Sequence, residues 1–179
     1  VAVPAIKGEM EQRFRPLLNT IEDATDLKIS FQEALSYDDA IAELVTGKAQ
    51  LGWLGQSAYI KAAKKIELEP LGVAFTEGVD ESVYRTVFLT KADSKFSSLT
   101  DLKGQRLILT EHSSTSGDTM PRHILTQFDL NPDIHGNFSD VIYAGSQEDA
   151  VRCLLAGKGD VAAVSQINLE KMFQDKSLD

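Results

Sequence analysis

The chain has 179 residues, of which 42% are hydrophobic and 25% charged, a normal composition for a globular protein of one domain or two small lobes. The formal net charge of −9, without a dense Lys/Arg tract, argues against a general nucleic-acid binder. No apolar run is long enough to span a bilayer, and no signal peptide is expected because residues 1–3 already predict a strand. The single Cys153 cannot form an internal disulfide and is expected to pack in the core.

The first part of the chain alternates short apolar segments with amphipathic ones. Apolar runs predict strands at residues 1–5, 51–54 and 71–75, and alternating apolar and polar residues predict another strand at 27–31. Helical spacing of apolar residues predicts a helix over 10–24, a second from the capping pair Ser36 and Asp39 to Gly47, and a third over 58–65. Residues 78–82 are predicted to form a polar loop.

The rest of the chain continues the alternation. Strands are predicted at residues 84–89, 106–110, 141–143 and 161–164, helices at 118–128, 148–156 and 169–173, and a helical turn at 98–102. Strands that alternate with helices predict an α/β fold with mainly parallel sheets.

An internal repeat is the most informative feature of the pattern. Residues 36–48 resemble residues 146–158 at a constant offset of 110 residues, and Gln56 matches Gln166 at the same offset. The chain therefore predicts two β-α-β-α-β lobes, residues 1–85 and 86–179, joined near the strand at 84–89 with a ligand cleft between them. The alternative is one continuous sheet whose repeat is only a structural relic.

A second feature is the serine loop, defined here as Ser113 to Gly117, which lies between a predicted buried strand and a predicted helix. Unpaired N–H groups and the dipole at a helix start, together with hydroxyl donors, are typical of a site for a phosphate-like or carboxylate anion. Gly117 would let a ligand approach the backbone. The alternative is an ordinary capped helix, and Pro121 predicts that this helix starts irregularly or bends.

Several short motifs together resemble one known family. They are Tyr37-Asp38, Gly52-Trp53-Leu54-Gly55 with Tyr59, Tyr84-Arg85, the segment 99–104, Ser114-Thr115-Ser116-Gly117 with Pro121, the segment 144–146 and the segment 157–161. In these motifs the chain is similar to the substrate-binding proteins of phosphate, phosphite and phosphonate ABC importers. The resemblance implies the type II periplasmic-binding fold, with two lobes and a hinge between them.

The resemblance also implies a ligand site. Ser114, Thr115 and Ser116 would hold the oxyanion with hydroxyl and N–H groups, and Tyr37 and Tyr84 would donate phenol hydrogen bonds to the same head group. Three glutamines complete the predicted site, because Gln56 and Gln166 lie at strand ends and Gln147 follows the Gly145-Ser146 turn; Gln147 and Gln166 would add amide donors or acceptors.

This chain departs from the family at three places. Gln147 stands where many relatives carry His, and Ile167 and Asn168 stand where amine-recognising relatives carry an acidic residue. A buried ammonium group needs a carboxylate partner, so phosphite, phosphate or a short alkylphosphonate is expected rather than an aminoalkylphosphonate. Family members also continue past the last helix and return to the first lobe. The first lobe is therefore either incomplete here or that of a shortened relative.

The function expected from the resemblance is capture of a small oxyanion for an ABC importer. The protein would be periplasmic or otherwise extracytoplasmic, free or lipid-anchored, with a membrane permease as partner and with no cofactor, metal or nucleic acid. An extracytoplasmic sensor domain of a signalling receptor is the alternative. A small α/β enzyme is disfavoured, because no Gly-x-Ser-x-Gly or phosphate-loop motif is present and the three histidines lack metal-ligand spacing.

Overall fold

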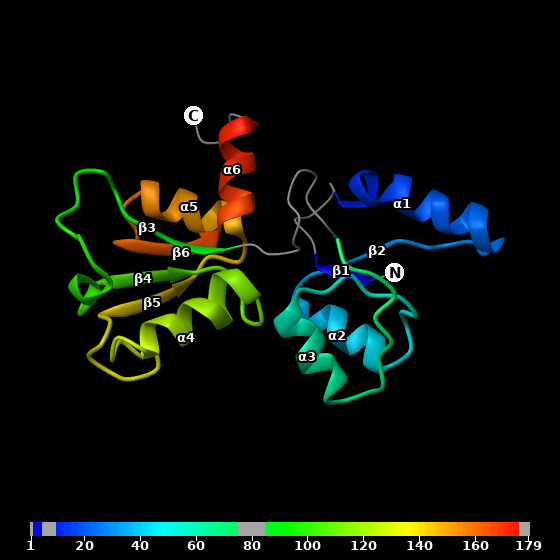
Figure 1. Cartoon of the computed structure of the whole chain (residues 1–179), viewed down its shortest axis with the longest axis horizontal. Helices are drawn as coiled ribbons and strands as arrows, with labels where there is room; N and C mark the ends of the chain where they lie inside the picture. Colours follow the sequence, from blue (N-terminus) through cyan, green and yellow to red (C-terminus); the bar gives the residue numbers. More distant parts are fainter. Residues whose placement is uncertain (1, 5–9, 75–84, 176–179) are drawn as a thin grey trace. The chain divides into compact units, whose positions relative to one another are not determined.

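The structure is a computed structural model that describes residues 2–4, 10–74 and 85–175. It consists of two compact units, Val1–Leu68 and Glu69–Asp179, and each is described by itself. Each unit has its own β-sheet with helices packed on it (Figure 1).

The first unit contains a short parallel sheet and three helices. Strand β1 (Ala2–Pro4) pairs with β2 (Gln32–Ala34), and the helices are α1 (Met10–Thr25), α2 (Tyr37–Val45) and α3 (Gln56–Ala63). Its core is small. One cluster is formed by Ala34, Ala40, Leu44 and Ala49, and a second by Ile41, Ala58 and Ala62.

The strands predicted for this unit are partly wrong. Strand β2 lies at 32–34 instead of 27–31, and neither residues 51–54 nor residues 71–74 form a strand of the described sheets. The predictions assumed that the apolar side chains face a core, whereas Leu27, Leu71 and Val73 are 63%, 77% and 66% exposed. Residue 75 and the predicted loop at 78–82 lie outside the described residues.

The second unit is built on a four-stranded sheet with the order β3-β6-β4-β5. The strands are β3 (Thr86–Leu89), β4 (Arg106–Leu109), β5 (Asp140–Tyr143) and β6 (Val161–Ser165). β4 is parallel to both β5 and β6, whereas β3 runs antiparallel to β6. The predicted alternation of strands and helices is therefore confirmed here, with one antiparallel edge strand.

Helices cover both faces of this sheet (Figure 1). Alternate side chains of a strand point to opposite faces, so Leu107 and Leu109 pack on the side of α4 (Met120–Thr126), with Leu125 in the same cluster. Ile108 packs on the other side, against residues of α5 (Gln147–Leu155) and α6 (Gln166–Gln174). A short 3-10 helix, Leu99–Leu102, precedes β4, as predicted.

The helices confirm the 110-residue repeat. α2 and α5 occupy equivalent positions; Ser36 caps the first and Ser146 the second, and each hydroxyl accepts a backbone N–H at 3.0 Å. Both helices are followed by a glycine in the left-handed region, Gly47 at φ 73° and Gly157 at φ 72°, where a side chain would be strained. α3 and α6 also begin at equivalent positions.

Candidate anion-binding site

The serine loop lies where predicted, between β4 and the helix that follows it. Ser113 adopts φ 72°, and Ser114 is the N-cap of a π-helical turn, Thr115–Thr119, which leads directly into α4. The wide turn is closed by the N–H of Thr119, which donates to the Ser114 carbonyl at 2.9 Å. Pro121 lies in the first turn of α4, where its missing N–H is tolerated. The predicted irregular helix start is confirmed.

Backbone and side-chain hydrogen bonds hold the loop to the sheet. The Gly117 carbonyl accepts the N–H of Thr110 at 3.0 Å, and the Ser116 carbonyl accepts the hydroxyl of Thr86 at 3.0 Å. Within the loop the Ser114 hydroxyl accepts the N–H of Gly117 at 3.2 Å. These bonds come from two strands, so the position of the loop is fixed by the sheet.

Gly117 is required for packing. A Cβ atom at this position would lie 1.9 Å from Oγ1 of Thr110, which is 2% exposed at the end of β4. The absence of a side chain at Gly117 therefore allows Thr110 to pack closely against it. The close approach predicted from the sequence was instead that of a ligand to the backbone.

The structure brings Gln147 onto the serine loop. Its Oε1 accepts the N–H of Ser165 at 2.7 Å, and its Nε2 lies 3.3 Å from Oγ of Ser116 and 3.5 Å from Oγ of Ser114. The first residue of α5 thus connects the end of β6 to two of the predicted ligand residues. Thr115 lies between them, half-buried.

The other predicted glutamine of this unit has a different contact. The N–H of Gln166 donates to the carbonyl of Arg85 at 2.8 Å, whereas its side-chain amide donates to Glu170 at 2.7 Å along the exposed side of α6. The described contacts of the Gln166 side chain therefore lie along α6 and not on the serine loop.

Two predicted site residues lie in the first unit. Tyr37 is the first residue of α2 and packs, half-buried, against the cluster of Ile41, Ala58 and Ala62. Gln56 is the exposed first residue of α3. Both therefore stand at helix N-termini, at the positions equivalent to Gln147 and Gln166. Tyr84 lies outside the described residues.

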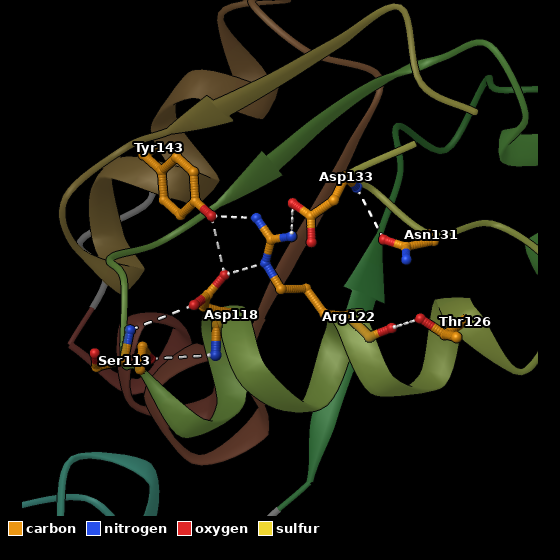
Figure 2. A network of polar contacts seen from close by, with 9 residues as sticks. Ser113, Asp118, Arg122, Thr126, Asn131, Asp133 and Tyr143 are labelled. Carbon is orange, nitrogen blue, oxygen red and sulfur yellow. Dashed lines mark hydrogen bonds and ion pairs between the residues drawn. The ribbon is translucent and has the colours of Figure 1, made fainter. Parts of the chain in front are cut away.

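A polar network that was not predicted from the sequence is joined to the serine loop through Asp118 (Figure 2). Asp118 is a buried residue. Its Oδ1 accepts a hydrogen bond from Nε of Arg122 at 2.6 Å and one from the hydroxyl of Tyr143 at 3.1 Å, and its Oδ2 accepts the N–H of Ser113 at 3.3 Å. Arg122 also donates to the Tyr143 oxygen and, at 2.6 Å, to Asp133. The spacing of Asp118 and Arg122, one helical turn apart, is the signal that could have indicated the pair.

The electrostatics of this network favour a charged pair. Partial burial lowers the pKa of Arg122, but hydrogen bonds to Asp118, Tyr143 and Asp133 outweigh it and raise that pKa above its usual value. Burial is the main cause that raises the pKa of Tyr143. Arg122 therefore stays cationic and Tyr143 stays a neutral hydroxyl donor beside the Asp118 carboxylate.

Within the part of the chain that the structure describes, no group of three or more His, Cys, Asp or Glu residues could hold a metal ion. None of the helices in these described ranges is both long and apolar enough to cross a membrane.

Known proteins are similar to this chain in sequence and in fold. A family model described as the periplasmic substrate-binding protein of phosphonate ABC transporters matches residues 3–179. The phosphate-import protein PhnD of Mycolicibacterium smegmatis is 24% identical over 98% of this chain, and the chain spans 57% of the length of that protein.

Two solved structures superpose on the chain, each at 18% sequence identity. PhnD1 of Prochlorococcus marinus, solved with methylphosphonate, gives a TM-score of 0.79 over 99% of this chain and 67% of its own. A binding-protein component of an ABC phosphonate transporter from Pseudomonas aeruginosa gives 0.81 over 98% of this chain and 59% of its own. The predicted type II periplasmic-binding fold is confirmed, and the chain belongs to the family of periplasmic substrate-binding proteins of phosphonate ABC transporters.

Proposed function

We propose that this chain captures a small phosphonate-, phosphite- or phosphate-like oxyanion outside the cytoplasm and presents it to the permease of an ABC importer. The observation that carries the proposal is the serine loop. It places Ser114 and Ser116, which are 4% and 5% exposed, beside the first turn of a helix. Hydroxyl groups can donate hydrogen bonds and a helix start carries partial positive charge, which is what an oxyanion requires.

Donors of this kind explain how an acidic protein can hold an anion. The chain carries a net charge of −9, so long-range electrostatics do not attract the ligand. The attraction is instead local, from dipoles that the sheet and α4 hold in place. Family membership supports Thr115 as a third donor on this loop and a role in binding without catalysis.

The proposal includes the remaining predicted residues as further ligand contacts. Tyr37 and Gln56 of the first unit, Tyr84, and Gln166 of the second would supply further hydrogen bonds to the bound oxyanion, in the cleft predicted between the two lobes. The hinge and the lobe boundary near residue 85 belong to the same proposal.

The first prediction concerns two of the loop hydroxyls. Thr115→Ala and Ser116→Ala should each weaken methylphosphonate binding, because loss of a hydrogen bond to a charged group costs roughly 1.5–3 kcal/mol, or about tenfold or more in affinity. Isothermal titration calorimetry measures the affinity, and the melting temperature reports the fold. Thr126→Ala is the matched control, since it removes an exposed hydroxyl whose described hydrogen bond, to the Arg122 carbonyl, lies within α4.

Unchanged affinity in both loop variants would reduce the serine loop to a helix cap. The same samples also test for catalysis. After incubation, phosphorus NMR should show only the phosphonate that was added. Conversion that Ser116→Ala abolishes would make the protein an enzyme and contradict the proposal.

A further inference from the structure

Two buried hydroxyl groups of the serine loop, those of Ser114 and Ser116, accept hydrogen bonds, and none of the residues that the structure describes accepts their own protons. Oγ of Ser114 accepts from the N–H of Gly117, and Oγ of both Ser114 and Ser116 lies within reach of Nε2 of Gln147. Among the described residues, neither hydroxyl has a partner to which it donates. A buried donor left unpaired is costly, so these protons point to an acceptor that comes from outside the chain.

The orientation of the Gln147 amide is set by chemistry. A backbone N–H can only donate, so the group 2.7 Å from the nitrogen of Ser165 must be the amide oxygen. The amide NH₂ therefore faces the loop. Ser165 is 2% exposed at the end of a strand in the middle of the sheet, which fixes the anchor of this side chain.

An NH₂ group that faces a hydroxyl fills one lone pair of its oxygen and leaves its proton for another acceptor. Oγ of Ser114 receives two donors, at 3.2 Å from Gly117 and 3.5 Å from Gln147, which occupy both of its lone pairs. Oγ of Ser116 receives the closer contact of Gln147, at 3.3 Å. Each serine proton is left to point away from Gln147. A ligand oxygen that carried a proton would find no free lone pair on Ser114.

We propose that Gln147 is a positioning residue that directs the protons of Ser114 and Ser116 toward the ligand, so that the site selects oxyanions whose oxygen facing Ser114 carries no proton. The favoured ligands are fully ionised phosphonates and sulfonates, rather than a protonated phosphonate. This inference rests on the proposed function and adds to it which protonation form is taken and which residue determines that choice.

A double-mutant cycle tests whether Gln147 acts through the serines. Gln147→Met removes the NH₂ donor at similar size, together with the oxygen that accepts the N–H of Ser165, and should weaken methylphosphonate binding about tenfold. In a Ser116→Ala background, the same change should cost much less, because the hydroxyl that it orients is gone. If the fold loss of affinity in the double variant equals the product of the losses in the two single variants, Gln147 acts independently of Ser116 and the inference is overturned. The melting temperature of the Gln147 variant should fall because the buried N–H of Ser165 loses its acceptor, and a single cooperative thermal transition excludes a general loss of folding.

Selectivity provides a readout that a purely structural role would not change. At a mildly acidic pH where methylphosphonate is a monoanion with one P–OH, methanesulfonate is a monoanion with none. The affinity ratio of methanesulfonate to methylphosphonate should fall in Gln147→Met, because the freed hydroxyls can turn to accept the P–OH proton. An unchanged ratio overturns the inference.

The wild-type titrations separate this inference from the function on which it rests. Binding of neither methylphosphonate nor methanesulfonate by the wild type would contradict the proposed function, and the inference with it. Wild-type binding combined with multiplicative losses or a constant ratio would overturn only the role of Gln147.

Discussion

Single residues of the serine loop have little freedom to change, and Gly117 has the least. Its Cα packs against the side chain of Thr110, and an added Cβ would lie 1.9 Å from Oγ1, 2.5 Å from Cγ2 and 2.7 Å from Cβ of that residue. Thr110 is buried at the end of β4 and its neighbour Leu109 is fully buried, so the strand cannot move aside. A larger residue at 117 would therefore displace the loop.

Gly117→Ala should destabilise the protein by about 1–3 kcal/mol, the usual cost of overpacking, which lowers the melting temperature by several degrees in a chain of this size. It should also weaken oxyanion binding, since the loop carries the donors. Gly72→Ala is the control, because a Cβ there meets nothing within 4 Å and the backbone is outside the left-handed region. Thermal denaturation of both variants decides the matter, and equal melting temperatures would show that the loop tolerates the methyl group.

Sequence reasoning found the hydroxyls of this loop but not what fixes them. A run of hydroxyl residues between a strand and a helix is a local pattern, visible without a structure. The contact of Gly117 with Thr110 and the link from Gln147 to Ser165 depend on how β4, β6 and α5 pack. Such tertiary contacts leave no periodic signal in the chain.

The element that supports the serine loop is the helical segment that begins within it, the turn Thr115–Thr119 followed by α4. Asp118 lies in the π-helical turn and Arg122 one turn later in α4, and the carboxylate accepts the N–H of Ser113 within the loop. A buried carboxylate so close to a bound anion would repel it. Arg122 neutralises that charge, with Asp118 and Arg122 side chains only 10% and 22% exposed.

Arg122→Met should therefore reduce both stability and anion affinity. Removing one partner of a buried ion pair costs about 3–5 kcal/mol because the other charge is left uncompensated. The double variant Asp118→Asn/Arg122→Met should recover much of both, since no uncompensated carboxylate remains. Urea denaturation and calorimetry measure the two quantities.

The matched control for this helix is Arg106→Met, which breaks the Arg106–Asp160 pair on β4 outside the serine loop. That pair is more exposed, 42% and 27%, so its loss should matter less and leave anion binding unchanged. If Asp118→Asn/Arg122→Met has the same stability and anion affinity as Arg122→Met alone, the guanidinium acts through its hydrogen-bond geometry and not through its charge.

Helices α2 and α5 were predicted from the sequence more accurately than the strands of the first unit. α2 and α5 carry their own start and stop signals, a capping serine and a terminal glycine, and their bounds agree with the prediction to within about one residue. The strands of the first unit were misplaced because a strand of three residues is defined by its partner. β2 pairs with β1, far away in the sequence, and its position depends on that pairing.

On the scale of the whole chain, the repeat preserves helices more than sheets. Both units contain the same pair of helices at an offset of 110 residues, but one described sheet has two strands and the other has four. The sequence repeat could predict the shared helices because caps and apolar spacing are local. It could not predict the different sheets. The second unit contains every described contact that fixes the serine loop.

The last prediction concerns the charge of the ligand. Acidic residues are plentiful in the chain, but two that lie next to the serine loop or to Gln147 already have cationic partners. Asp118 pairs with Arg122, and Glu148 lies 3.8 Å from Arg152. Position 168, at the start of α6, is the neutral Asn168. A ligand ammonium group would thus lose its hydration without gaining a carboxylate, a substantial cost.

Methylphosphonate should therefore bind more tightly than aminoethylphosphonate, by about tenfold or more, since an uncompensated buried charge costs well over 1.4 kcal/mol. Calorimetric titration of both ligands at one pH and salt concentration measures the difference. In Asn168→Asp the added carboxylate should improve the binding of aminoethylphosphonate and so reduce the affinity difference between the two ligands. A clear preference of the wild type for aminoethylphosphonate would show that a carboxylate reaches the ligand, and the neutral, donor-rich site described here would then be wrong.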